Sequence, residues 1–199
     1  MLLRMGELSH ETVSLSVNSY IEGKTAYAKV RNLSFTLILM ADEAEDKALE
    51  IMARFQPVAS DLRILKSYIK IAYDFERYGR YALDVSQAYE RLGGIKECDI
   101  WVKEYITEMS GKVLSMVRLS VDSLKSYDTK LAKTLSGTEK QVDDMYFKYI
   151  DRLVEKAPAT SKCTISSVLV VRYLERIADH AIYIGESIIY LATGEKVTL

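Results

Sequence analysis

The chain has 199 residues, enough for one sizeable domain or for two small domains that share a hydrophobic core. Its apolar fraction of 49% and charged fraction of 28% are typical of a folded soluble protein and exclude a mainly disordered one. The net charge is −1 and no basic stripe follows the chain, so nothing favours a nucleic-acid partner. The longest apolar run, around residues 35–41, is far shorter than the roughly 20 residues that cross a bilayer, so we expect no direct membrane insertion.

The N-terminal residues include Arg4 and Glu7 and contain no long apolar stretch, so we expect no signal peptide. The two cysteines, Cys98 and Cys163, are isolated in the sequence and form no Cys-x-x-Cys pair. We therefore expect no disulfide framework, which is consistent with a reducing, cytoplasmic location.

Residues that form turns are scarce, with two prolines and nine glycines, and long helices are therefore expected. A first helix is predicted from about Gly6 to Tyr20. The helix breaks are at residues 22–24, 57, 93–94, 126–128 and 157–159. Short connections at these breaks require neighbouring helices to run antiparallel. We predict an all-α fold of six antiparallel helices, arranged as two three-helix bundles in residues 1–92 and 95–199.

Apolar residues recur every three or four positions in the third and the last predicted helices, and both stripes are expected to face the core. The stripe of the last helix consists of Val170, Val171, Leu174, Ile177, Ala178, Ala181, Ile184, Gly185, Ile188 and Leu191. The stripe of the third helix consists of Leu62, Leu65, Ile69, Ala72, Gly79, Ala82 and Leu83.

The two halves also resemble each other in sequence. The segment at residues 76–82 reads ERYGRYA and the segment at residues 175–181 reads ERIADHA, so Glu, Arg and Ala recur at the same places. The offset is 99 residues, half of the chain, and each segment follows a proline, Pro57 or Pro158, at a similar distance. An internal duplication of a three-helix unit explains this pattern.

Four acidic residues are candidates for a metal site. Glu175 and Asp179 are four residues apart and project from one face of the last helix, and Glu139 and Asp143 repeat this spacing on the preceding helix. Four carboxylates this close repel one another unless a cation or basic side chains lie among them. Oxygen ligands favour hard ions such as Mg²⁺, Mn²⁺, Ca²⁺ or ferric iron. The alternative is a solvated face on which Arg172 and Arg176 pair with the acids.

Other chemistry has little support. His180 points about 100° away from Asp179 on a helix, and Ala178 stands where a Glu-x-x-His iron motif would need histidine. His10 has no partner that the sequence identifies. With two histidines and no glycine-rich phosphate loop, we expect no catalytic residues and no nucleotide cofactor.

The 14 tyrosines outnumber the four phenylalanines. We expect many of them to line the seams between helices with the hydroxyl at the rim. A docking surface is the alternative for the cluster Tyr68, Tyr73, Tyr78 and Tyr81.

Several segments resemble those of a known family. Residues 56–63 read QPVASDLR, the most characteristic stretch of the PhoU family, and residues 74–80 resemble its acidic D/E-L-E-R-I-G-D motif. A second copy of this motif stands at residues 173–181, the run 139–143 resembles the acidic motif of the family's fifth helix, and residues 185–194 resemble its closing helix. The resemblance covers nearly the whole chain.

This resemblance implies two three-helix bundles side by side and no catalysis. Members of the family are negative regulators that link the ATPase subunit of a phosphate ABC transporter to a sensor histidine kinase. The resemblance further implies a cytoplasmic homodimer that binds iron, manganese or magnesium through acidic motifs. Carried over to this sequence, the metal ligands are Glu139, Asp143, Glu175 and Asp179.

The first half departs from the family pattern. Arg80 replaces the final aspartate after Glu76, and Ser34 and Ile38 stand where the acidic motif of the second helix is expected. Arg80 is expected to pair with Glu76 at a spacing of four residues, so we predict one metal site in the second half alone. Two alternatives remain at this point: a PhoU-type module of another transporter or channel, and a metal-dependent hydrolase or oxidase in a carboxylate-rich bundle.

Overall fold

The computed structural model describes residues 1–156 and 161–199. These two ranges form six α-helices and one short 3₁₀-helix and contain no strand, so the predicted all-helical fold is confirmed. The predicted break at residues 157–159 lies outside the described residues. The elements are α1 (Leu2–Glu22), α2 (Tyr27–Phe55), α3 (Ala59–Leu92), η1 (Ile95–Glu97), α4 (Ile100–Ser126), α5 (Thr129–Lys156) and α6 (Lys162–Thr193).

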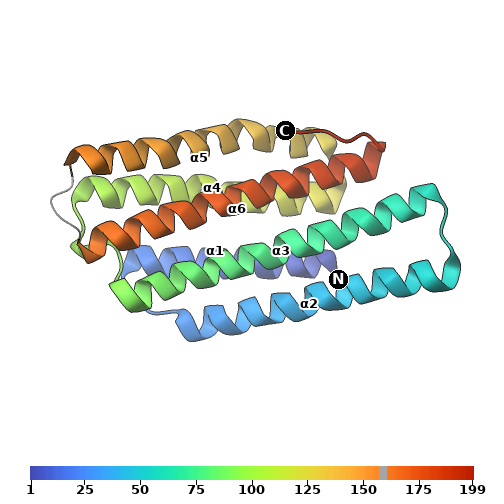
Figure 1. Cartoon of the computed structure of the whole chain (residues 1–199), viewed down its shortest axis with the longest axis horizontal. Helices are drawn as coiled ribbons and strands as arrows, with labels where there is room; N and C mark the ends of the chain where they lie inside the picture. Colours follow the sequence, from blue (N-terminus) through green and yellow to red (C-terminus); the bar gives the residue numbers. More distant parts are fainter. Residues whose placement is uncertain (157–160) are drawn as a thin grey trace.

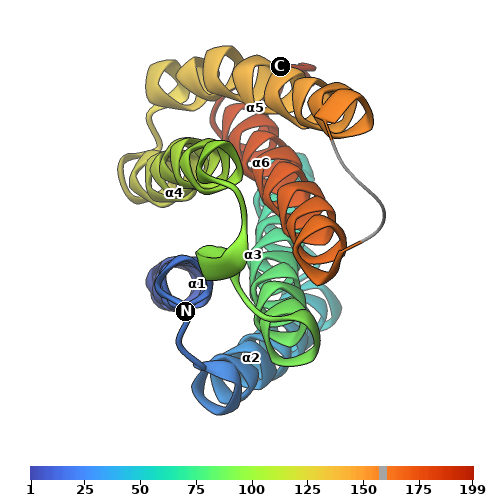
Figure 2. The same cartoon turned by 90° about the vertical axis from the view of Figure 1, so that its left-hand side faces the viewer.

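The six helices form two antiparallel three-helix bundles that pack against each other. In the end-on view of Figure 2, α2 lies at one side of the molecule and α5 at the other, with α1 and α3, then α4 and α6, between them. The halves meet mainly through α3 and α6, and also through α1 and α4. No described helix has an apolar stretch long enough to cross a membrane.

The break between the halves depends on two glycines. Gly93 ends α3 with a φ of 84° and a ψ of 170°, a conformation that is essentially confined to glycine. Gly94 passes close to the end of α1, where an added Cβ atom would lie 2.6 Å from the carbonyl oxygen of Tyr20. The Ser166 hydroxyl donates a hydrogen bond of 2.9 Å to the Gly93 carbonyl oxygen, which ties this turn to α6.

The core confirms the stripe of the last helix except for Leu191, which is half-buried, and confirms only part of the stripe of the third. In α6 the side chains of Leu174, Ile177, Ala181, Ile184 and Ile188 are fully buried. The expectation for Leu62 in α3 was wrong, because this residue is 42% exposed. The first turns of α3 extend with the end of α2 beyond the other helices (Figure 1), so α2 is the neighbour of that part of the stripe and leaves Leu62 partly exposed.

The two cysteines correct another expectation. Cys98 and Cys163 form a disulfide bridge, with their Cα atoms 5.6 Å apart, although 65 residues separate them in the sequence. The segment after α3 brings Cys98 back to the first turn of α6, and this contact arises only when the chain is folded. The bridge therefore links the connection between the halves to the beginning of α6.

Candidate metal site

The four acidic residues lie on two helices that pack against each other. Glu139 and Asp143 belong to α5, and Glu175 and Asp179 belong to α6. Glu175 is only 7% exposed because it lies on the edge of the stripe that α6 turns toward the core, and the other three are half-buried. The fold therefore removes four carboxylates partly from water, which is unfavourable for the charged form.

The carboxylates influence one another's ionisation. The pKa of Glu175 is raised to about 6: burial raises it most, the negative charges of Asp179 and Asp143 also raise it, and Arg172 and Arg176 lower it. The pKa of Glu139 is raised by burial, then by Asp143 and Asp179. Because Glu139 on α5 responds to Asp179 on α6, the acids of the two helices form one electrostatic group.

Two arginines on α6 pair with the acids of the same helix. Arg172 donates a hydrogen bond of 2.7 Å to Oε1 of Glu175, and Arg176 donates one of 3.0 Å to Oδ2 of Asp179. Oε2 of Glu175 is buried and accepts no hydrogen bond from any described residue; Nε of Arg176 is 3.7 Å away. The pairing with arginine that the sequence left open is therefore present.

The donor set fits a hard cation in its chemistry, since it consists of carboxylate oxygens and one of them is buried without a hydrogen bond. Within the described residues, however, no three Asp, Glu, His or Cys side chains converge closely enough to enclose an ion. The arginine side chains occupy carboxylate oxygens of Glu175 and Asp179, so an ion would require them to move.

The first half differs at the corresponding place. Arg80 donates to the carboxylate of Glu76, as the spacing predicts. On α2, Ser34 faces this part of α3, because an added Cβ atom on Gly79 would lie 3.4 Å from the Cα atom of Ser34. At this place α2 contributes the hydroxyl of Ser34 where a carboxylate was expected, and α3 contributes Arg80, which neutralises Glu76.

Comparison with known proteins identifies the family. The family model described as the PhoU domain matches residues 2–88 and again residues 106–188, one match in each half of the chain. The chain belongs to the PhoU family. It is 34% identical over 204 residues to a phosphate-specific transport system accessory protein PhoU homolog of Clostridium acetobutylicum, covering all of this chain and 92% of that protein.

Solved PhoU structures share the fold. The crystal structure of PhoU from Pseudomonas aeruginosa superimposes with a TM-score of 0.91 at 30% identity, covering 98% of this chain and 94% of that one. The phosphate transport system regulatory protein PhoU of Streptococcus pneumoniae superimposes with a TM-score of 0.88 at 22% identity, covering 100% of this chain and 94% of that one. The second likeness supports the fold alone.

A polar contact between the two PhoU repeats was not predicted. Nδ1 of His180 on α6 lies 2.8 Å from Oδ1 of Asp74 on α3, and both residues are buried. Burial raises the pKa of Asp74. With the offset of 99 residues, the symmetry-related pair is Tyr173 and Tyr81, whose rings stack with centroids 6.3 Å apart.

The Asp74–His180 contact gives His180 a partner outside the acidic group on α5 and α6. The only sequence signal was that Asp74 interrupts an otherwise apolar stretch beside the PhoU motif. A polar residue at such a place indicates a buried partner without identifying it.

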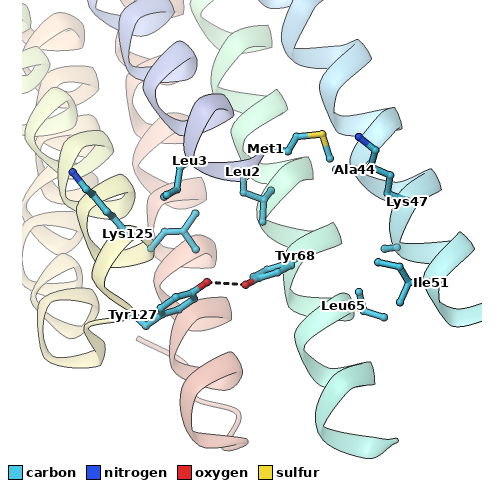
Figure 3. Close-up of a pocket in the computed structure, with 12 residues that line it drawn as sticks. Met1, Leu2, Leu3, Ala44, Lys47, Ile51, Leu65, Tyr68, Lys125 and Tyr127 are labelled. Carbon is cyan, nitrogen blue, oxygen red and sulfur yellow. Dashed lines mark hydrogen bonds between the residues drawn. The ribbon is translucent and has the colours of Figure 1, made fainter. Parts of the chain in front are cut away.

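A mainly apolar pocket is lined by residues of α1, α2, α3 and α4. Its volume is about 380 Å³. Figure 3 shows it between the beginning of α1, α2, α3 and the end of α4. At its edge the hydroxyls of Tyr68 and Tyr127 point toward each other and form a hydrogen bond of 2.7 Å. Tyr68 and Tyr78 pack between helices as predicted, but the hydroxyl of Tyr78 is buried against Ser120 and does not lie at the rim. Tyr73 is 52% exposed.

Proposed function

We propose that this chain is a non-catalytic regulator of phosphate uptake. In this proposal it acts in the cytoplasm as a negative regulator, as a homodimer, and links the ATPase subunit of a phosphate ABC transporter to a sensor histidine kinase. The observation that supports a role in phosphate uptake most directly is the PhoU match in both halves of the chain. The relatives from Clostridium acetobutylicum and Pseudomonas aeruginosa, named as accessory proteins of a phosphate-specific transport system, add to it.

The proposal includes one cation site in the second half, formed by Glu139, Asp143, Glu175 and Asp179 and taking iron, manganese or magnesium. The nearly buried Glu175 supports it, because one of its oxygens has no hydrogen bond among the described residues and its pKa is raised to about 6. A bound cation would neutralise the mutual repulsion of the four acids and connect α5 to α6. The cation site and the regulatory role are independent parts of the proposal, and each is tested by its own experiment.

The regulatory role is tested in cells. The gene is deleted and complemented, and phosphate uptake and a reporter of the phosphate-responsive kinase are measured at high phosphate. We expect the deletion to leave the reporter active at high phosphate and the wild-type chain to restore repression.

Co-purification of the transporter ATPase subunit with the tagged chain tests the contact, and sedimentation tests the dimer. Unchanged uptake and reporter activity in the deletion strain would contradict the proposal and would favour a module of another transporter.

A further inference from the structure

Two arginines lie on the outside of the acidic group. The side chains of Glu175 and Asp179 are 9% and 19% exposed, whereas those of Arg172 and Arg176 are 36% and 41% exposed. Each arginine is three residues before the acid to which it donates a hydrogen bond, on the same helix. The guanidinium groups therefore form a positively charged layer between the carboxylates and water.

An aromatic side chain accompanies Arg172, and another accompanies the first-repeat counterpart of Arg176. The guanidinium of Arg172 lies 5.2 Å from the ring centre of Tyr146 on α5. In the first repeat the residue that corresponds to Arg176 is Arg77, which donates a hydrogen bond of 2.6 Å to the Tyr81 hydroxyl and lies 4.8 Å from its ring centre. Arg77 thus shows an arginine at this motif position packed on an aromatic side chain, whereas the second repeat has His180 in place of Tyr81.

The charges in the group favour exchange between arginine and a cation. Four carboxylates and two guanidinium groups leave two negative charges, with one oxygen of Glu175 lacking a hydrogen bond among the described residues. A divalent cation between the carboxylates would place a second positive charge within a few ångströms of each guanidinium group. Such repulsion is weakly screened in a half-buried site, and the partly exposed guanidinium groups have water on their outer side.

We propose that Arg172 and Arg176 are internal counter-ions that occupy Glu175 and Asp179 until a cation binds, and that the cation displaces both guanidinium groups onto the surface of α6. This inference rests on the proposed cation site. In the described arrangement the arginines are paired and the acids do not converge around an ion. Cation binding then changes the charge that α6 presents to a partner without requiring any helix to move.

The test is the affinity of the purified chain for Mn²⁺, measured from the loss of the electron paramagnetic resonance signal of free Mn²⁺. We expect Arg172→Gln and Arg176→Gln each to bind Mn²⁺ about threefold to tenfold more tightly than the wild type, since each removes a competing ion pair. The matched control is Arg118→Gln, which removes the same charge from a surface pair with Glu7 between α4 and α1. Its affinity should change less than about twofold.

A second measurement follows the arginines directly. Labelling with phenylglyoxal and mass spectrometry should show Arg172 and Arg176 becoming more reactive when Mn²⁺ is saturating, with Arg118 unchanged. If the wild type binds Mn²⁺ but the arginine variants bind it as the control does, or more weakly, the counter-ion role is wrong and the cation site stands. If neither the wild type nor any variant binds Mn²⁺, the cation site itself is wrong. Binding by the arginine variants alone would show that the arginines block the site in the wild type, which would contradict their displacement by the cation.

Discussion

Replacing Glu175 with Gln tests whether the acidic group opposes folding when no cation is present. The pKa of Glu175 is raised from its ordinary value of 4.5 to about 6, so the folded chain holds this proton more tightly than the unfolded chain. The contribution of Glu175 to stability is therefore greatest below pH 4.5 and is lost as the pH rises through about 6. The shift corresponds to about 2 kcal/mol, and solvent screening at the edge of the bundle reduces this to about 1 kcal/mol.

The assay is urea unfolding of wild type and Glu175→Gln at pH 4.5 and pH 8 in the presence of a chelator. We expect the variant to gain about 1 kcal/mol relative to the wild type on going from pH 4.5 to pH 8. Any effect of the introduced amide on packing is the same at both pH values, so it cancels in this comparison. The control is Glu43→Gln: the hydrogen bond from Lys47 lowers the pKa of this exposed residue, so its small effect has the opposite sign. A difference between wild type and Glu175→Gln that stays constant or reverses with pH would refute the reasoning.

Three further predictions concern the fold. Ile177→Ala should lower the free energy of unfolding by about 2–5 kcal/mol in urea, because Ile177 is fully buried, and a loss below about 0.5 kcal/mol would contradict its place in the core. Cys98→Ser should cost about 4 kcal/mol under oxidising conditions, because the bridge closes a loop of 65 residues; unfolding midpoints that do not respond to a reductant would argue against the bridge. Gly94→Ala should cost about 1–3 kcal/mol, because its Cβ atom would meet the Tyr20 carbonyl oxygen, and an unchanged thermal unfolding midpoint would contradict this.

The helices were predictable because their signals are local. Few glycines and prolines interrupt the chain, and the stripe through Leu174 and Ile188 repeats with the period of a helix. Gly93 marked the division between the halves because its backbone conformation requires glycine. The failure at Leu62 had a tertiary cause, since an apolar stripe does not specify where the neighbouring helix ends.

Features that depend on contacts between the halves were not predictable. The bridge between Cys98 and Cys163 and the contact between Asp74 and His180 connect residues that only the packing of the two bundles brings together. The acidic group was identified from its spacing on α5 and α6. Whether Arg172 and Arg176 pair with these acids could not be predicted, because a spacing of three residues is equally compatible with an ion pair and with a free guanidinium group.

The cation site of the second half is tested most directly by metal content. Wild type, Asp179→Asn and Glu76→Gln are prepared identically and analysed by elemental mass spectrometry, with circular dichroism to confirm that each is folded. Asp179→Asn removes one charge from the acidic group with little change in shape, and Glu76→Gln makes the matched change in the first half. We predict that wild type and Glu76→Gln retain the same cation and that Asp179→Asn retains much less. Equal metal content in all three proteins would contradict a site at Glu139, Asp143, Glu175 and Asp179.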